Sequence, residues 1–161
     1  MKTGNLILLD TNIVNFILLD SPELQNYAWI LNGKRFALSF ATMAELVLWK
    51  LMDMEKQDKL LFRDAMEKLN NFILDCVIFE SSPSISFRAA ALAFNYKKKH
   101  IEKDEKSDSN IRFNKRWHDW WIAATAIEHK LDIVTHNAKD FKDIKEIKII
   151  GPDSKPPSLL I

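Results

Sequence analysis

Four acidic residues of this 161-residue chain stand where a strand is predicted to end or a helix to begin. They are Asp10 in LLDTN, Glu45 in SFATMAEL, Asp119 in WHDWWIAATA and Asp140 in THNAKDF. Four carboxylates at one edge of a sheet repel each other, so one or more must take up a proton unless a divalent cation lies among them. Oxygen ligands without a set of Cys or His ligands favour Mg²⁺ or Mn²⁺ over zinc. The pattern therefore indicates a centre for a hard divalent cation.

Each acid also has a purely structural interpretation at a helix N-terminus, where side-chain oxygens accept hydrogen bonds from backbone N–H groups. Three spacings fit helix caps: Asp10 with Asn12, Thr42 with Glu45 in a first turn, and Asn137 with Asp140. The fourth acid, Asp119, could interact with a helix macrodipole from the first turn. Taken singly, each residue leaves both alternatives open.

One helix pattern favours the functional interpretation. Asp119 shares a helix face with Ala123 and Ala126, at i+4 and i+7. Small residues at these positions allow a helix to lie close to a sheet, which would hold the carboxylate near the strand ends. A charge in such a place is costly unless it is paired or bound to a metal ion.

Short apolar segments alternate with helical ones along the chain, as in a parallel sheet with helices on both faces. The predicted strands are 5–9, 36–39, 76–80, 132–135 and 146–150, and the predicted helices are 21–32, 42–52, 54–74, 82–99, 117–130 and a short one from 138. Residues 1–150 are expected to form one three-layer α/β/α domain, with a polar loop at 100–116 and an irregular tail at 151–161. In such sheets ligands bind beyond the carboxyl ends of the strands, which is where the four acids lie.

The motifs LLDTN, T-x-x-E, D-x-x-I-A-A-x-A and T-x-N-x-x-D-F occur in the order and approximate spacing of PIN domains. From about Leu6 to Ile150, the chain most resembles the VapC-type ribonuclease toxins of bacterial toxin–antitoxin pairs. The resemblance implies that the acidic quartet (Asp10, Glu45, Asp119 and Asp140) is catalytic and holds Mg²⁺, with Mn²⁺ as an alternative. It also implies supporting roles for Thr11, Asn12, Thr135 and Asn137.

The activity that this resemblance implies is endonucleolytic hydrolysis of RNA phosphodiester bonds. Asp10 and Asp119 are the first choices for direct metal ligands, and Glu45 and Asp140 are expected to act through water. Some relatives carry an acid at the position of Asn137, so the resemblance leaves open whether Asn137 or Asp140 takes the fourth metal position. The implied partners are an RNA substrate, a cognate antitoxin protein and a second copy of the chain. The alternatives are a PIN-like RNA-processing nuclease that is not a toxin, and a non-catalytic module that binds metal or RNA.

Charge is distributed unevenly despite a formal net charge of +1. Residues 97–117 hold eight basic and four acidic side chains, a difference of +4, immediately before Asp119. This basic segment is expected to be a loop or insertion that contacts RNA phosphates, and a solvated helix end is the alternative. The candidate contacts are Lys97, Lys98, Lys99, Lys115 and Arg116. Three nearby tryptophans, which could stack on bases or lie in the core, are Trp117, Trp120 and Trp121.

Composition disfavours several other classes of protein. The three glycines cannot form a G-x-G-x-x-G or Walker A loop. A phosphatase of the haloacid-dehalogenase type usually carries a second Asp where this chain has Asn12. No segment approaches the roughly 20 apolar residues that span a bilayer. The single cysteine, Cys76, cannot form an internal disulfide, which is typical of a reducing compartment, so the expected location is the cytoplasm.

Overall fold

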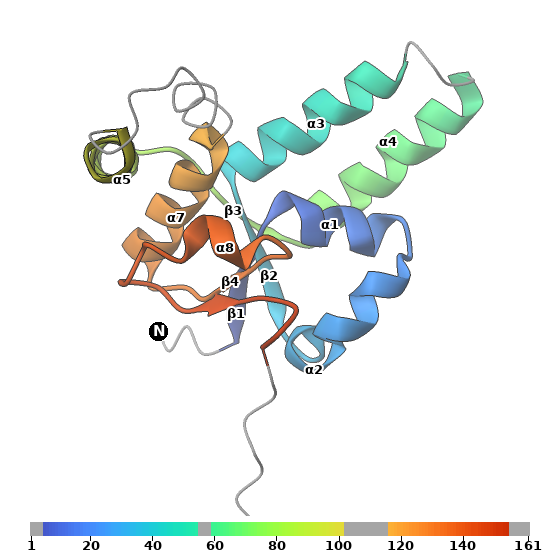
Figure 1. The fold of residues 1–161 in the computed structure, drawn as a ribbon. Coiled ribbons are helices and arrows are strands. Elements are labelled where there is room, and N and C mark those ends of the chain that lie inside the picture. Colours follow the sequence, from blue (N-terminus) through green and yellow to red (C-terminus); the bar gives the residue numbers. More distant parts are fainter. Residues whose placement is uncertain (1–4, 55–58, 102–115, 155–161) are drawn as a thin grey trace, which may run out of the picture.

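The computed structural model describes residues 5–54, 59–101 and 116–154. A five-stranded sheet lies at its centre, with helices on both faces (Figure 1). The strands are β1 (Leu6–Leu9), β2 (Arg35–Ser39), β3 (Val77–Phe79), β4 (Ile133–Val134) and β5 (Ile149–Ile150). All neighbouring strands pair in parallel, so the prediction of an α/β/α domain around a parallel sheet is confirmed.

The strand order, β3-β2-β1-β4-β5, places the first strand in the middle of the sheet. Within β1, Leu8 pairs with Ala37 of β2 on one side and with Ile133 of β4 on the other. The chain adds β2 and β3 on one side of β1 and later crosses over to add β4 and β5 on the other side. The order therefore reverses between β1 and β4, and residues that follow these two strands stand at the switch point.

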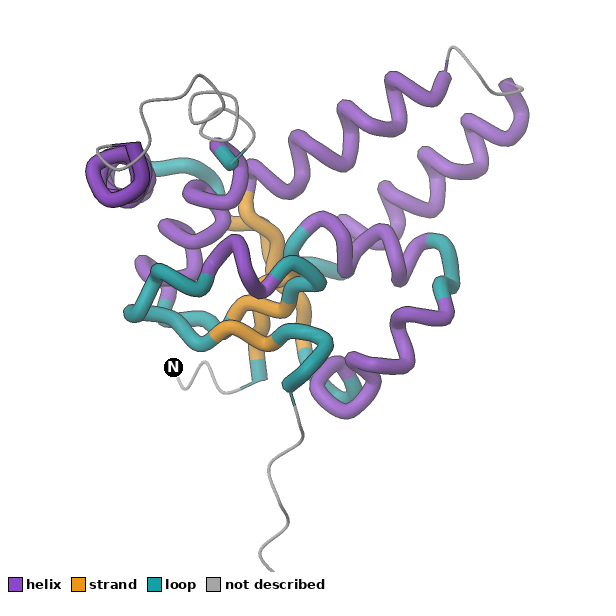
Figure 2. Tube along the Cα trace, viewed as in Figure 1, coloured by secondary structure: helices purple, strands orange, loops and turns teal. Residues whose placement is uncertain are grey.

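Side chains alternate along β1 and so reach both layers of helices. Ile7 and Leu9 belong to one buried cluster, and Leu8 belongs to another. The first cluster includes residues of α1 (Thr11–Leu18), the 3-10 helix η1 (Pro22–Tyr27), α3 (Phe40–Met54) and α4 (Lys59–Leu74), with α2 (Ala28–Leu31) packed beside them. The second includes residues of α7 (Trp117–His129) and α8 (Ala138–Phe141). Figure 2 shows these helices on opposite sides of the orange strands.

Helix α7 lies between the sheet and another helix. Its residues Ala123 and Ala126 are completely buried in the cluster that includes Leu8, as the spacing from Asp119 predicted. On another side of α7, Trp120 and Ala124 pack with residues of α5 (Pro83–Ile101). Small side chains let α7 approach the sheet closely, and this approach brings its first turn to the strand ends.

Two segments near the N-terminus differ from the prediction. Helix α1 begins directly after Asp10, although no helix range was predicted there. Its sequence is as apolar as the strand before it, and a single buried acid separates the two elements, so hydrophobicity alone does not mark the boundary. The helix predicted at 21–32 is instead η1 followed by the four residues of α2.

Two of the helix-cap interpretations are wrong. Helix α3 begins at Phe40, and Ser39 Oγ accepts a hydrogen bond from the backbone N–H of Thr42 at 3.0 Å. Ser39 therefore makes the N-terminal capping bond, and Glu45 lies in the second turn rather than in a capping box. Asn137 occupies the N-cap position of α8, but its side chain makes no capping hydrogen bond.

The basic segment does not begin as a loop, because Lys97, Lys98 and Lys99 lie within α5. Residues 102–115, most of the predicted loop, fall outside the described part of the chain. The last strand is confined to Ile149–Ile150, and residues 151–154 of the predicted tail contain neither helix nor strand. No helix in the described ranges combines the length and the hydropathy that crossing a membrane requires.

The close packing of α7 makes a prediction about stability. Ala126 is fully buried, so Ala126→Leu forces a larger side chain between α7 and the sheet and should lower the free energy of unfolding by about 1–3 kcal/mol. Ala90 is exposed on α5, and Ala90→Leu serves as the matched control with an expected change within about 0.5 kcal/mol. Urea denaturation measures both values, and equal effects would contradict this account of the α7 packing.

Candidate functional site

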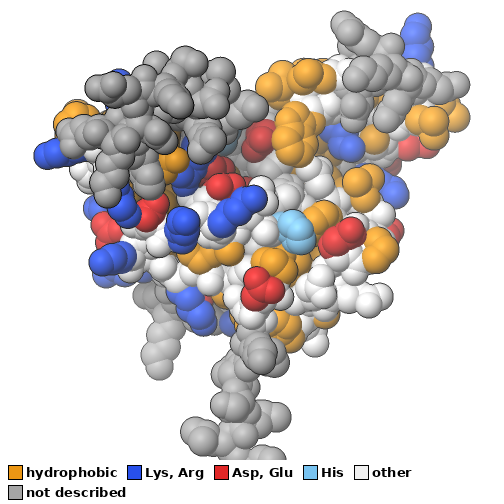
Figure 3. Space-filling view, viewed as in Figure 1, with side chains coloured by type: hydrophobic (Ala, Val, Ile, Leu, Met, Phe, Trp, Pro, Cys, Tyr) orange, Lys and Arg blue, Asp and Glu red, His pale blue; other side chains and the backbone are white. Residues whose placement is uncertain are grey.

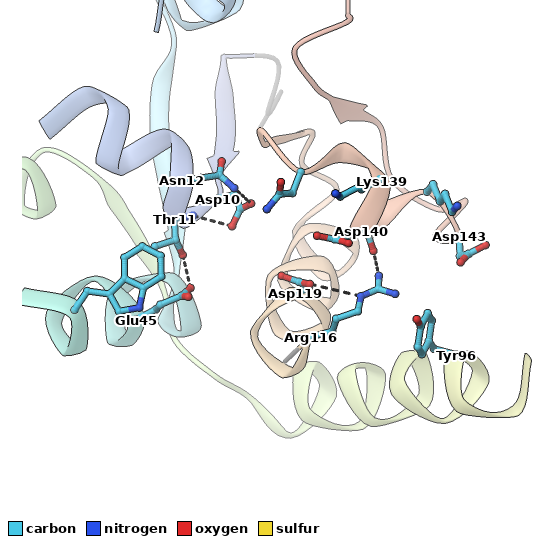
Figure 4. Close-up of a pocket in the computed structure, with 13 residues that line it drawn as sticks. Asp10, Thr11, Asn12, Glu45, Tyr96, Arg116, Asp119, Lys139, Asp140 and Asp143 are labelled. Atoms are coloured by element: carbon cyan, nitrogen blue, oxygen red, sulfur yellow. Dashed lines mark hydrogen bonds and ion pairs between the residues drawn. The ribbon is translucent and has the colours of Figure 1, made fainter. Parts of the chain in front are cut away.

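A cavity of about 740 Å³ opens beyond the carboxyl ends of β1 and β4 (Figure 4). All four members of the acidic quartet line it, and they come from four separate places in the chain. Asp10 follows β1, Glu45 lies on α3, Asp119 on α7 and Asp140 on α8. The remaining lining residues are Thr11, Asn12, Trp49, Tyr96, Arg116, Asn137, Lys139, Lys142 and Asp143.

Asp10 is the most deeply buried of the four acids, with 5% of its surface exposed. Its Oδ1 accepts a hydrogen bond from the backbone N–H of Thr11 at 2.7 Å, which is the capping bond of α1. Its Oδ2 accepts from Asn12 Nδ2 at 2.7 Å and from Thr135 Oγ1 at 2.6 Å. Burial nevertheless raises the pKa of Asp10, because it outweighs these three hydrogen bonds.

The polar residues predicted to support the quartet form a connected network. Thr11 Oγ1 donates to Glu45 Oε2 at 2.6 Å, which links α1 to α3. Asn12 Oδ1 accepts from the backbone N–H of His136 at 2.9 Å. Thr135 Oγ1 accepts from the backbone N–H of Asn137 at 3.0 Å while it donates to Asp10. The loop after β4 is thereby tied to the N-terminus of α1.

The pKa of Asp119 is also far above the ordinary value of an aspartic acid. Burial and, to a smaller extent, the nearby charges of Asp10 and Asp140 together raise the pKa of Asp119 to about 7. Arg116 opposes the shift, with its Nε 3.7 Å from Asp119 Oδ2. A carboxyl group with a pKa near neutrality reports an excess of negative charge in a poorly hydrated place.

Arg116 is a cation of the cavity wall that pairs with a member of the quartet. Its guanidinium sits over the ring of Tyr96, 4.3 Å from the ring centroid, and donates a hydrogen bond to the backbone oxygen of Asp140. The side chain is 16% exposed, and its buried Nε has no hydrogen-bond partner, although it lies within ion-pair distance of Asp119. Figure 4 shows the guanidinium between Asp119 and Tyr96. Of the basic residues singled out in the sequence, Arg116 is the one that lines the cavity.

The other predicted RNA contacts lie elsewhere. Lys97 and Lys98 are exposed on α5 and do not line the cavity. Lys99 makes an ion pair with Asp143 at 2.6 Å and borders a smaller neighbouring cavity. Lys115 falls outside the described residues.

Three lining residues escaped the sequence analysis although their spacing could have identified them. Trp49 follows Glu45 by four positions on α3, so the two lie on the same helix face. Lys139 and Lys142 flank Asp140 in the segment AKDFK. The tryptophans singled out instead belong largely to the packing around α7: Trp120 is buried, and Trp117 packs edge-on against Trp120 and Trp121.

The donor set of the quartet fits a hard divalent cation. It consists of carboxylate oxygens, and burial, with a smaller contribution from neighbouring carboxylates, raises the pKa values of Asp10 and Asp119. Within the described ranges, no three Asp, Glu, His or Cys side chains stand close enough to hold an ion as they are. A divalent cation among these carboxylates would relieve their mutual repulsion.

Comparison with solved structures shows the same fold in chains that share little sequence. The chain is similar to VapBC2 from Rickettsia felis bound to a promoter DNA fragment, with a TM-score of 0.62, 23% identity and coverage of 91% of this chain and 98% of that chain. DNA-bound VapBC from Salmonella typhimurium gives a TM-score of 0.65, 20% identity and coverage of 91% and 97%. VapBC-5 from Mycobacterium tuberculosis, a member of the VapBC family of toxin–antitoxin systems, gives a TM-score of 0.55 and 18% identity, with coverage of 91% of this chain and 98% of that chain.

Comparison with the curated proteins gave no significant match. The family comparison is decisive instead, because residues 7–147 match the PIN domain. That range includes β1 except Leu6, the whole of β4, every described helix and the whole acidic quartet. The chain therefore belongs to the PIN domain family.

Proposed function

We propose that the chain is a Mg²⁺- or Mn²⁺-dependent endoribonuclease and the toxin of a type II toxin–antitoxin pair. The observation that carries the proposal is the acidic quartet, in which four carboxylates from separate elements line one cavity at the switch point of a parallel sheet. A structural role for each acid would not require that they meet. Membership of the PIN domain family supports hydrolysis of nucleic acid as their shared task.

Asp10 and Asp119 are proposed as the residues that hold the metal directly, because Asp10 is buried, Asp119 is partly buried, and both have raised pKa values. When bound, a divalent ion supplies an activated water and neutralises charge on the phosphate. Asn12 and Thr135 hold Oδ2 of Asp10 in a fixed position, which leaves few ways for this carboxylate to turn. We assign the orientation of water and the acceptance of protons to Asp140 and to Glu45, which accepts a hydrogen bond from Thr11.

The basic residues of the cavity are proposed to bind the substrate backbone. Arg116, Lys139 and Lys142 line the side formed by α7 and α8. Positive side chains beside an acidic centre attract phosphates that the quartet alone would repel. Figure 3 shows blue side chains gathered beside acidic ones over this part of the molecule. The choice of RNA over DNA rests on the family resemblance.

The proposed partners are an RNA substrate, a cognate antitoxin and a second copy of the chain. The similarity to VapBC structures supports the antitoxin and the toxin role. An antitoxin that neutralises the toxin must prevent RNA from reaching the quartet. The cavity that the quartet lines is therefore the surface that we expect such a protein to cover.

Cleavage of labelled single-stranded RNA tests the nuclease proposal. Wild-type protein should cleave RNA in Mg²⁺ or Mn²⁺ and lose activity in EDTA. Asp10→Asn should lower kcat/KM by about 100-fold or more, because a metal-holding charge is lost while the shape is kept. Asp20 is exposed and does not line the cavity, so Asp20→Asn is the matched control and should cleave like wild type. Undiminished cleavage by Asp10→Asn would contradict the role of Asp10 in holding the metal. Cleavage of a DNA strand of the same sequence measures the preference for ribose over deoxyribose.

The raised pKa of Asp119 predicts how the stability of the metal-free protein depends on pH. The folded pKa of Asp119, about 7, lies above the ordinary unfolded value, so its contribution to stability is present at low pH and lost as the pH rises through 7. Metal-free wild type should therefore be less stable at pH 8 than at pH 5. At pH 8, Asp119→Asn should raise the free energy of unfolding by roughly 1–3 kcal/mol, with little gain at pH 5.

Urea titrations in EDTA at both pH values measure this difference, with Asp20→Asn as the control for removal of one carboxylate. Added Mg²⁺ should stabilise wild type at pH 8 more than Asp119→Asn, because the ion neutralises the same repulsion. A pH-independent effect of Asp119→Asn would show that the charge at this position is not what destabilises the metal-free fold.

Growth measurements test the toxin proposal separately from the chemistry. Induced expression of the wild-type chain in a bacterial host should arrest growth, and Asp10→Asn should not, because arrest requires cleavage. Co-expression of a small protein encoded beside this chain should restore growth if that protein is the antitoxin. If the wild-type protein cleaves RNA but its expression leaves growth normal, the chain is a nuclease and the toxin proposal is wrong.

A further inference from the structure

A large aromatic side chain stands half-exposed in the wall of the cavity. Trp49 lines the cavity together with Glu45, yet 43% of its surface is open to solvent. Leaving so large an apolar ring in water forgoes the stabilisation that burial would give. Its position beside an acidic centre suggests that a ligand covers the ring.

Trp49 lies on the face of α3 that carries Glu45, and exposed Met52 lies about 60° from it around the helix. At about 100° per residue, Trp49 lies about 40° around the helix from Glu45. By the same measure it lies about 100° from Leu48, 160° from Leu51 and 180° from Phe40, which are also exposed. Trp49 thus belongs to the face that carries a quartet member, whereas the other three form a stripe on another side of the helix.

The other aromatic side chains near the cavity are already engaged. The Tyr96 ring lies under the Arg116 guanidinium. Trp117 is 44% exposed but packs against Trp120 and Trp121 with ring centroids 6.2 and 6.3 Å away, and it does not line the cavity. Among the described residues, Trp49 makes no ring contact with another aromatic or cationic side chain. Its ring is the one in the cavity wall that is available for stacking.

The cavity also has two chemically different sides. Arg116 and the lysines of α8 and its C-terminal end lie on one side of the quartet, whereas Trp49 is contributed by α3. In Figure 3 basic side chains gather over α7 and α8 and hydrophobic ones over the hairpin of α3 and α4. Phosphates match the first side and a nucleobase matches the second, since any base presents a π-face to an aromatic ring. A single-stranded polynucleotide offers both groups one nucleotide apart.

We propose that Trp49 is a stacking platform for a nucleobase of single-stranded RNA next to the phosphate that the quartet engages. The inference rests on the proposed nuclease function and adds a subsite to it. Trp49 binds and positions the substrate, and the chemistry remains with the quartet. The side chain would select unpaired RNA, because a base must leave its own stack to reach the ring.

Cleavage kinetics on oligoadenylate RNA in Mg²⁺ test the proposal with two substitutions. Trp49→Leu keeps apolar bulk but removes the ring, and should raise KM by about tenfold or more with a smaller effect on kcat. Trp49→Phe keeps a ring and should recover most of the affinity. Trp117→Leu is the matched control, because Trp117 is equally exposed outside the cavity, and its KM should stay at the wild-type value.

A base-free probe separates stacking from charge. In the Asp10→Asn background, which binds without cleaving, oligoadenylate should bind more weakly when Trp49 is also changed to Leu. An abasic ribose–phosphate oligomer should bind equally well with either residue at position 49. Equal thermal unfolding of the two proteins confirms that the fold is kept.

The outcomes distinguish this inference from the nuclease proposal. If wild type cleaves RNA but Trp49→Leu has an unchanged KM, the stacking platform is wrong, and the ring is then open to a partner protein instead. Equal weakening of the abasic oligomer by Trp49→Leu would likewise overturn it. If wild type neither binds nor cleaves RNA, the nuclease proposal itself fails.

Discussion

The burial of Asp10 is the constraint on which the rest of the site depends. A carboxylate at the end of the central strand is removed from water, and this is tolerated because three donors from three residues satisfy its oxygens. Those donors belong to the N-terminus of α1 and to the end of β4. One buried side chain therefore fixes the angle at which α1 leaves the sheet and the position of the loop that precedes Asp140.

The other acids are less buried than Asp10 and are arranged around it. The backbone N–H of Thr11 donates to Asp10, and the hydroxyl of Thr11 donates to Glu45, so the same residue links Asp10 to α3. The alanine face of α7 brings Asp119 near enough for the charge of Asp10 to raise its pKa. Arg116 then offsets part of the repulsion from within the cavity wall. A net charge of +1 conceals this local opposition of charges.

Sequence reasoning identified the parallel sheet and the four acids because both depend on short-range signals. Apolar strands ending in Asp10 or followed by Asn137 and Asp140 are visible in a few residues. Alanines at i+4 and i+7 from Asp119 likewise predict a helix packed against a sheet. The boundaries of α1 and α3 were less predictable. The capping bond of α3 is made by Ser39 and not by Thr42, and Glu45 instead accepts a hydrogen bond from Thr11, which is distant in the sequence.

The composition of the cavity wall could not be read in the same way. Arg116 was one of eight basic residues in its segment, and nothing local distinguishes it from Lys97 or Lys98, which lie on exposed helix surface. Its location depends on the packing of Tyr96, which is twenty positions away in another helix. Trp49 was overlooked because the three tryptophans around Asp119 gave a stronger pattern, and these are mainly engaged with each other.

The bond between Thr135 and Asp10 spans 125 positions of the chain. On a ribosome, the first strand and α1 emerge long before Thr135, Asp119 and Asp140 have been synthesised. A growing chain thus carries Asp10 without the groups that complete its surroundings, and the four acids can share one cavity only after Asp140 has been translated. Any chemistry that needs the whole quartet is therefore withheld until that stage of synthesis.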